Sequence, residues 1–504
     1  MNPLLFTDGY KVDHRRQYPE QTTLVYSNWT PRKSRIEGVE EVVFFGLQYF
    51  IKKYMIEAFD KDFFSQPKGE VCQKYQRRIN NYLGENKVGI KHIEALHELG
   101  YLPMVVKALP EGVSVPIRVP MLTMYNTKPE FFWLTNYFET LLSTTLWLPC
   151  NSATIAKQYR RILDKYAEET SAIQEFVDWQ GHDFSMRGMG GLEAAIMSSA
   201  GHLLSFTGTD TIPSIDFFEE YYNADSDTEL IGGSVAATEH SVMCMGTNEG
   251  EQETFKRLIT EIYPNGIVSI VSDTWDLWKV LTEYLPNLKN EVLNREGKVV
   301  IRPDSGDPAD IICGNPNGKT EAEKKGVIQL LWEIFGGRTN EKGYKELDSH
   351  IGAIYGDSIT LERAKDICER LKQNGFASTN VVLGIGSFTY QYNTRDTFGF
   401  AMKATYGEVN GVGREIYKDP VTDDGTKKSA KGLIKIEKNE GCYFMKDQVS
   451  WEEEQQGELK EVFKDGKLLV NETLKRIRYR LKNTKQYSSC SKPTSHQQMH
   501  QASF

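Results

Sequence analysis

The sequence has few cysteines and lacks any long apolar run. Its seven cysteines among 504 residues are scattered, odd in number and never spaced as Cys-x-x-Cys. This pattern argues against a disulfide framework and against a structural zinc site. No stretch approaches the roughly 18 apolar residues of a membrane helix, and residues 1–11 lack the apolar core of a signal peptide. We therefore expect a cytoplasmic protein with no membrane partner.

The chain also lacks an excess of positive charge. Its formal net charge is -9 and 26% of its residues are charged, so nothing indicates a nucleic acid partner. A local cationic pocket for phosphate groups remains compatible with this balance. The chain is long enough for two or three domains. Residues 483–504 are polar and predict a disordered tail.

Two kinds of pattern divide the sequence. Residues 105–126 alternate β-forming residues with proline and glycine, which is typical of short strands joined by turns. Similar runs return late in the chain, while strand-like and helix-like stretches alternate in between. We predict a β-rich α+β domain formed by residues 1–150 together with 391–482. Residues 151–390 predict an α/β barrel, closed or incomplete.

The barrel prediction rests on a rhythm in residues 151–390. Apolar runs there end at polar residues, at intervals of about 30 residues with one longer gap. A strand and a helix in about 30 residues form a βαβ unit, and a series of such units builds a parallel sheet. The residues that follow the strands then meet at one edge of the sheet. They are Asp210, His240, Asp273, Asp304, Asp357 and Ser387.

The longer gap holds residues 307–349, which are rich in glycine, lysine and glutamate. They predict an excursion on the surface. Within it, Gly314–Thr320 resembles a phosphate-binding P-loop, but three residues separate its glycines where that loop has four. We therefore set a P-loop aside.

The most informative stretch is 231–241, which ends close to His240. Small residues lead up to this histidine, so its imidazole can face a cleft, although a single histidine is more often a core or surface residue. Asp273 and Asp304 are candidates for the surroundings of a divalent cation that bridges an anionic substrate.

Other strand ends suggest contacts with phosphate, sugar and a flat ring. The turn that contains Gly386 and Ser387 can present backbone N–H groups to a phosphate. Gly356 and Asp357 can hold ribose hydroxyls, and Phe184 offers an aromatic face. Cations at or beside strand ends are Arg187, Arg302, Arg395 and Lys403.

Ten segments, in order along the chain, carry a resemblance to a known family. They are TDGYK (7–11), FFGLQY (44–49), WLTN (133–136), HDFSMRG (182–188), GTDT (208–211), ATEHS (237–241), VSDTWD (271–276), IRPDSG (301–306), GD (356–357) and KDPV (418–421). Through them the sequence resembles the nicotinamide phosphoribosyltransferases, which belong to the type II phosphoribosyltransferases. The likeness runs from Thr7 to about Lys431.

The resemblance implies a homodimer whose active sites are shared between subunits. Phe184 would stack on one face of nicotinamide, and Tyr10 of the partner subunit would cover the other. Asp210 would accept a hydrogen bond from the carboxamide NH2, while Arg302 would donate to the carboxamide oxygen. The implied reaction joins nicotinamide to the ribose of phosphoribosyl pyrophosphate. It gives nicotinamide mononucleotide and pyrophosphate, in NAD salvage.

The resemblance also implies sites for the ribose, the phosphates, ATP and Mg2+. ATP, as a co-substrate, would phosphorylate His240, and Asp273 and Asp304 would orient that histidine and the surroundings of the Mg2+. The remaining implied contacts are Gly356 and Asp357 for the ribose, Gly386, Ser387, Arg187 and Arg395 for the 5-phosphate, and Arg32, Lys403 and Lys418 for the pyrophosphate or ATP phosphates.

Two alternatives stay open. A nicotinate phosphoribosyltransferase has a related barrel, but Asp210 argues against it because a carboxylate repels the carboxylate of nicotinate. A non-catalytic ligand-binding protein on the same barrel is the other alternative. His240, Arg302 and both aspartates argue against it, because binding alone does not require all of them.

Overall fold

The computed structural model describes residues 1–356, 358–418 and 430–484. The chain divides into two compact units. The first comprises Met1–Thr154, Phe218–Ala224 and the chain from Asn393 onward, and the second comprises Ile155–Phe217 and Asp225–Tyr392. In the described ranges, no helix is long and apolar enough to cross a membrane. Of the tail that the sequence predicts to be disordered, residues 485–504 lie outside the described ranges.

An antiparallel sheet of seven strands forms the framework of the first unit. Trp29 on an interior strand, β1, lies opposite Met402 on β15, so an N-terminal and a C-terminal segment pair directly. This confirms the predicted β-rich domain built from both ends of the chain. In spatial order the strands are β16 (Val412–Glu415), β15 (Ala401–Val409), β1 (Thr22–Thr30), β5 (Leu122–Asn126), β3 (Met104–Ala108), β19 (Lys460–Lys464) and β20 (Lys467–Leu468).

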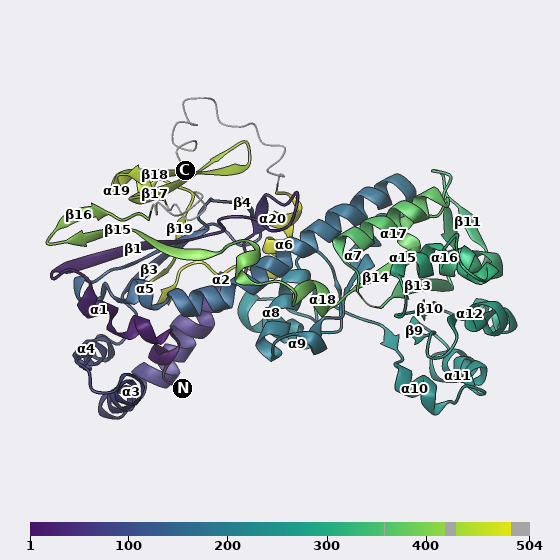
Figure 1. Cartoon of the computed structure of the whole chain (residues 1–504), viewed down its shortest axis with the longest axis horizontal. Helices are drawn as coiled ribbons and strands as arrows, with labels where there is room; N and C mark the ends of the chain where they lie inside the picture. The colour runs from purple at the N-terminus through teal and green to yellow at the C-terminus, as the bar shows by residue number, and fades with distance from the viewer. Residues whose placement is uncertain (357, 419–429, 485–504) are drawn as a thin grey trace. The chain divides into compact units, whose positions relative to one another are not determined.

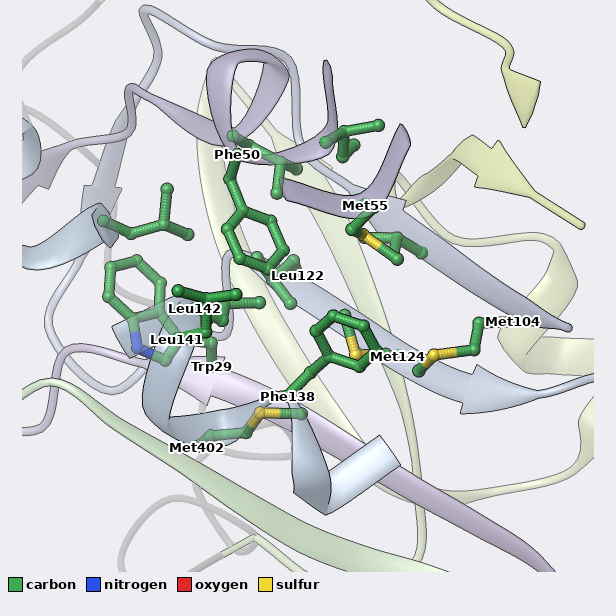
Figure 2. Packing of buried hydrophobic residues seen from close by; sticks show 14 of the residues in the cluster. Trp29, Phe50, Met55, Met104, Leu122, Met124, Phe138, Leu141, Leu142 and Met402 are labelled. Carbon is green, nitrogen blue, oxygen red and sulfur yellow. The ribbon is translucent and has the colours of Figure 1, made fainter. Parts of the chain in front are cut away.

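The hydrophobic core of the first unit lies between these strands and several helical segments. The ring of Trp29 stacks on Phe400 with centroids 4.6 Å apart, and Figure 2 shows Phe50, Phe138 and Met124 pointing into the same cluster. Burial of each such side chain stabilises the unit by roughly 1.5–3 kcal/mol. The helices of this unit include α2 (Leu47–Phe50), α3 (Lys68–Leu83), α4 (Lys91–Leu99), α5 (Leu134–Tyr137), α19 (Trp451–Gln455) and α20 (Leu474–Lys482). Two strand pairs complete it, β2 (Glu41–Val43) with β4 (Ser114–Pro116) and β17 (Leu433–Asn439) with β18 (Cys442–Val449).

A parallel sheet of seven strands organises the second unit. Its edges approach each other, because the segment before β8 bonds to the start of β7: the amide of Gly233 donates to the Thr207 carbonyl (2.8 Å), and the amide of Thr209 donates to the Gly233 carbonyl (3.0 Å). The sheet therefore curls into a barrel, which confirms the predicted fold class. In spatial order the strands are β7 (Gly208–Thr209), β6 (Gly181–Asp183), β14 (Val381–Ile385), β13 (Ile351–Tyr355), β10 (Val299–Arg302), β9 (Val268–Val271) and β8 (Ala236–Ala237).

Helices alternate with these strands, as the rhythm of the sequence predicts. Figure 1 shows α15, α16 and α17 beside strands β10, β13 and β14. In α17 the buried positions Ala364, Ile367, Cys368 and Leu371 recur at helical spacing and give the helix one apolar face. The helices include α7 (Val177–Gln180), α8 (Leu192–His202), α10 (His240–Met245), α11 (Glu251–Arg257), α12 (Leu277–Lys279), α13 (Leu285–Asn287), α14 (Lys289–Leu293), α15 (Pro308–Cys313), α16 (Glu321–Phe335), α17 (Leu361–Gln373) and α18 (Ser387–Tyr390). The chain passes from the second unit to the first within α9 (Pro213–Tyr222), after Phe217. A long helix, α6 (Glu139–Thr170), contains Pro149.

The prediction that residues 307–349 form a surface excursion is wrong. They contain α15 and α16, and α16 buries Val327, Ile328 and Leu331, so this segment supplies helices of the barrel. Only the hairpin of β11 (Gly337–Thr339) and β12 (Lys345–Leu347) lies at its end. The charged and glycine-rich composition does not indicate the buried apolar residues, whereas their helical spacing does.

The cysteines follow the sequence prediction with one exception. Within the described ranges, five cysteines carry free thiols, whereas Cys442 is disulfide-bonded. Burial raises the pKa of the Cys150, Cys313 and Cys368 thiols, so these three are packing residues and not nucleophiles.

Candidate active site

The carboxyl ends of the parallel strands gather the predicted residues of the second unit. The amide of Phe184, after β6, donates to the Ile385 carbonyl on β14 (3.0 Å), and the amide of Asp210, after β7, donates to the Asp183 carbonyl (3.0 Å). The predicted residues that follow a strand at this edge are Phe184, Asp210, His240, Asp273, Asp304, Gly356, Gly386 and Ser387. Asp357, which the strand pattern predicts to lie with them, is outside the described residues.

His240, Asp273 and Asp304 form one cluster, in which the nearest ligand atoms all lie within 4.8 Å of one another. The His240 Nε2 lies 3.4 Å from Asp304 Oδ1, and its Nδ1 lies 3.1 Å from the Thr274 hydroxyl. Asp273 Oδ2 accepts from the amides of Asp304 and Ser305, both at 2.9 Å, and from the Ser305 hydroxyl at 2.6 Å. These bonds fix the first carboxylate and place the second beside it.

The same cluster has the features of a cation site. The second oxygen of Asp273, Oδ1, is buried and has no hydrogen-bond partner in the described part of the chain. Burial, together with the neighbouring charge of Asp273, raises the pKa of the Asp304 carboxyl, while His240 and Arg302 oppose this change. A divalent cation would satisfy the unpartnered oxygen and relieve the repulsion between the two carboxylates. The residues therefore fit a hard cation such as Mg2+.

Asp210 and Phe184 lie close together at the ends of the neighbouring strands β7 and β6. Asp210 Oδ1 accepts hydrogen bonds from His182 Nε2 (2.9 Å) and from the Ser234 hydroxyl (2.7 Å). The His182 ring lies 4.5 Å from the ring of Phe184. The strand end thus presents an aromatic face next to an ionised acceptor.

Arg302, at the end of β10, is a cation at this edge. Its guanidinium donates to the carbonyl of Thr238. Burial lowers the pKa of Arg302, while the carboxylates of Asp304, Asp210 and Asp273 oppose this effect. A guanidinium with three carboxylates around it stays charged at neutral pH, so the site combines a fixed cation with fixed anions.

The turn after β14 packs against the turn that holds Arg187. A Cβ added to Gly188 would stand 2.0 Å from the Ser387 hydroxyl oxygen, so only glycine allows this approach. Arg187 itself is exposed. A Cβ on Gly356 would lie 3.2 Å from that of Asp304, which places the β13 turn beside the acidic cluster. Backbone and one cation therefore line this part of the edge.

The predicted residues of the first unit form a separate cationic group. Burial lowers the pKa of Lys403 on β15; Glu139 opposes this change, and the nearby charges of Arg32, Lys11 and Lys418 reinforce it. Lys11 pairs with Glu139. Such a group is suited to phosphate.

The two other predicted residues of the first unit are exposed. Tyr10 is 63% exposed, and its ring lies 5.4 Å from that of His14. Arg395 pairs with Asp396 (3.1 Å). The Nζ of Lys11 lies 5.3 Å from the centre of the Tyr10 ring.

Four polar residues that support the site were not predicted from the sequence. They bond to residues that were predicted, but each is a small or isolated polar residue without a pattern of its own. For His182 a signal existed, since it lies in the same short segment as Phe184, two positions before it. The four are His182, Ser234, Thr274 and Ser305.

Comparison with known families covers nearly the whole chain. Residues 179–467 match the nicotinate phosphoribosyltransferase (NAPRTase) family, and residues 2–98 match the nicotinamide phosphoribosyltransferase N-terminal domain. The chain is 56% identical over 493 residues to a nicotinamide phosphoribosyltransferase of Acinetobacter baylyi, covering 95% of this chain and 97% of that protein. It is 38% identical to one of Mycoplasma pneumoniae, covering 85% and 94%.

Solved structures show the same fold at low sequence identity. A nicotinate-nucleotide pyrophosphorylase from Pyrococcus furiosus matches with a TM-score of 0.58 at 14% identity, covering 97% of both chains. Human nicotinic acid phosphoribosyltransferase matches with a TM-score of 0.56 at 14% identity, covering 95% of this chain and 93% of that one. At this identity the likeness concerns the fold alone.

Proposed function

Since the chain belongs to the nicotinamide phosphoribosyltransferases of the NAPRTase family, we propose that it transfers the phosphoribosyl group of phosphoribosyl pyrophosphate to nicotinamide. The products are nicotinamide mononucleotide and pyrophosphate, and the reaction serves NAD salvage. The observation that carries the proposal is the group formed by Phe184, Asp210 and Arg302 at one edge of the barrel. This group offers an aromatic face, an acceptor and a cationic donor, which are the three features that a neutral aromatic amide requires.

In this proposal nicotinamide lies on Phe184, with its carboxamide NH2 donating to Asp210 and its carboxamide oxygen accepting from Arg302. Tyr10 of the partner subunit covers the opposite face in a homodimer. The ring nitrogen of nicotinamide has a free lone pair, so no base is needed to activate it. When nicotinamide is held near C1 of the ribose, proximity and orientation can lower the activation free energy of the transfer by several kcal/mol.

The bond that forms joins the pyridine nitrogen to ribose C1, and the bond that breaks joins C1 to the pyrophosphate oxygen, which leaves with both electrons. Positive charge develops on the sugar, and the anionic leaving group must be stabilised. The unpartnered Asp273 Oδ1 and the raised pKa of Asp304 support a role for these two residues in holding Mg2+. When bound, Mg2+ would supply charge neutralisation for pyrophosphate.

The remaining roles concern the phosphates and the ribose. We assign the 5-phosphate to the turn of Gly386 and Ser387 with Arg187 and Arg395, and the ribose to Gly356 and Asp357. The cationic group of Arg32, Lys403 and Lys418 would bind pyrophosphate or the phosphates of ATP. The repulsion between these positive charges supports this assignment, because a bound anion would reduce that repulsion.

The proposal is tested with the purified full-length protein, nicotinamide, phosphoribosyl pyrophosphate and Mg2+, with nicotinate in a parallel reaction. We expect nicotinamide mononucleotide to form, and nicotinate to react at least about a hundredfold more slowly, because like charges at Asp210 cost several kcal/mol. Faster turnover of nicotinate would establish the alternative enzyme. Absence of both products would leave a ligand-binding protein.

His240 is the proposed acceptor of the ATP γ-phosphoryl group. In that step an imidazole nitrogen forms a bond to phosphorus, the bond from phosphorus to the bridging oxygen breaks, and ADP leaves. The half-exposed ring, held by Thr274 and Asp304, supports this role. The added negative charge would strengthen cation binding in the cluster.

His240→Ala is therefore expected to abolish stimulation by ATP while a slow basal transfer persists. The measurement compares initial rates with and without ATP, and records incorporation of γ-labelled phosphate. His350→Ala is the matched control, because its Nδ1 also contacts an aspartate, Asp348, at 2.6 Å, but at the start of β13. ATP stimulation that survives in His240→Ala would rule out the phosphohistidine.

A further inference from the structure

Both hydrogen bonds to the Asp210 carboxylate reach the same oxygen. His182 Nε2 and the Ser234 hydroxyl converge on Oδ1, at 2.9 and 2.7 Å. The other oxygen, Oδ2, accepts no hydrogen bond from any residue that the structure describes. The side chain of Asp210 is 44% exposed, while that of His182 is only 9% exposed. The protein thus holds the carboxylate through Oδ1 and leaves Oδ2 for a ligand.

The imidazole of His182 has little freedom to move. On one side its ring lies 4.5 Å from the Phe184 ring. On the other, a Cβ added to Gly208 would stand 2.6 Å from His182 Nδ1, so the chain approaches the ring as closely as glycine permits. Because Gly208 immediately precedes Thr209 and Asp210, the same approach sets the distance between the imidazole and the carboxylate.

The electrostatics agree with this arrangement. Burial opposes ionisation of Asp210, but the hydrogen bond and charge of His182, the Ser234 hydroxyl and the charge of Arg302 together lower the pKa of Asp210 below its usual value. An ionised carboxylate only accepts hydrogen bonds, so Nε2 of His182 carries the proton in this contact. The donor and the acceptor are therefore fixed in their roles.

We infer that His182 is a positioning residue for nicotinamide binding, which anchors Asp210 Oδ1 so that Oδ2 alone is presented to the carboxamide NH2. This inference rests on the proposed function and adds a residue that acts through Asp210 without touching the substrate. A freely rotating carboxylate would offer its acceptors in many directions, and the amide would lose orientation as well as contact.

Two substitutions separate the hydrogen bond from packing. His182→Gln keeps a donor that can reach Asp210, while His182→Phe keeps the ring beside Phe184 and removes the donor. We expect His182→Phe to raise KM for nicotinamide about tenfold with kcat within about twofold, because it removes one hydrogen bond to a charged group. His182→Gln should restore KM to within about threefold of the wild type. A purely structural role predicts the opposite order, with the ring variant nearer to wild type.

A double-mutant cycle tests whether His182 acts through Asp210. In an Asp210→Ser background, His182→Phe should change KM for nicotinamide less than twofold, since no carboxylate remains to be positioned. An undiminished tenfold effect in that background would overturn the inference.

Gly208→Ala provides a second route if His182→Phe does not fold, which the thermal unfolding midpoint reports. The added methyl group must displace the imidazole, so KM for nicotinamide should rise about as much as in His182→Phe. An unchanged KM in folded Gly208→Ala or folded His182→Phe would refute the positioning role. Failure of the wild type to form nicotinamide mononucleotide would instead refute the proposed function, so the two failures are distinguishable.

Discussion

Asp273→Asn is expected to lower kcat for phosphoribosyl transfer at least about a hundredfold, the usual effect of removing one preorganised electrostatic contact. Asparagine keeps the shape of the side chain, and its oxygen can still accept from the amides of Asp304 and Ser305. Its NH2 group would then occupy the position of the buried Oδ1, which has no donor around it. A donor at that position repels a cation where the carboxylate would attract one.

The measurement is the initial rate as a function of Mg2+ concentration. Asp276→Asn is a matched control in the same loop, because Asp276 caps α12 through the amides of Trp278 and Lys279, and asparagine caps a helix equally well. The control should keep the activity of the wild type. If Asp273→Asn retains activity within tenfold at every Mg2+ concentration, the cation is not held by Asp273.

The position of this cluster could be predicted from the sequence because the strand rhythm is strong there. Strands β9 and β10 are mostly apolar, and in each case one residue separates the strand from an aspartate, so the parallel pairing brings Asp273 and Asp304 together. What the sequence could not specify is the direction of each carboxylate. That direction depends on the Ser305 hydroxyl and on backbone amides, which leave no periodic signal.

The strands at the other side of the barrel were harder to predict. Strands β7 and β8 have two residues each, and β6 has three, of which His182 and Asp183 are polar. Such strands form because neighbouring strands and the bridge between Gly208 and Gly233 supply their pairing, and no local pattern predicts this. The support of Asp210 by His182 and Ser234 therefore emerges only from the tertiary structure.

Composition was misleading for residues 307–349. Their lysines and glutamates predict solvent exposure, yet α16, which begins with a capping box between Thr320 and Glu323 and kinks at Gly326, buries apolar side chains after the kink. Average polarity says little about a helix with one buried face, whereas the spacing of Val327, Ile328 and Leu331 does.

Asp210→Ser is expected to change which pyridine the enzyme accepts. The substitution removes the charge that repels nicotinate but leaves Arg302, whose guanidinium can pair with a carboxylate. We expect the ratio of kcat/KM for nicotinamide to that for nicotinate to fall by about a hundredfold, since like-charge juxtaposition costs several kcal/mol. Most of the change should come from a higher kcat/KM for nicotinate, and the rest from a higher KM for nicotinamide.

Competition experiments measure this ratio directly, with both pyridines in one reaction and the two mononucleotides quantified separately. Asp216→Ser is the matched control, because it removes the same charge from the exposed first turn of α9, the helix that follows Asp210. If general electrostatics set the selectivity, the control would shift the ratio too. If Asp210 contacts the pyridine substituent, only Asp210→Ser will shift the ratio. An unchanged ratio in Asp210→Ser would mean that another residue at the barrel edge discriminates between the two pyridines.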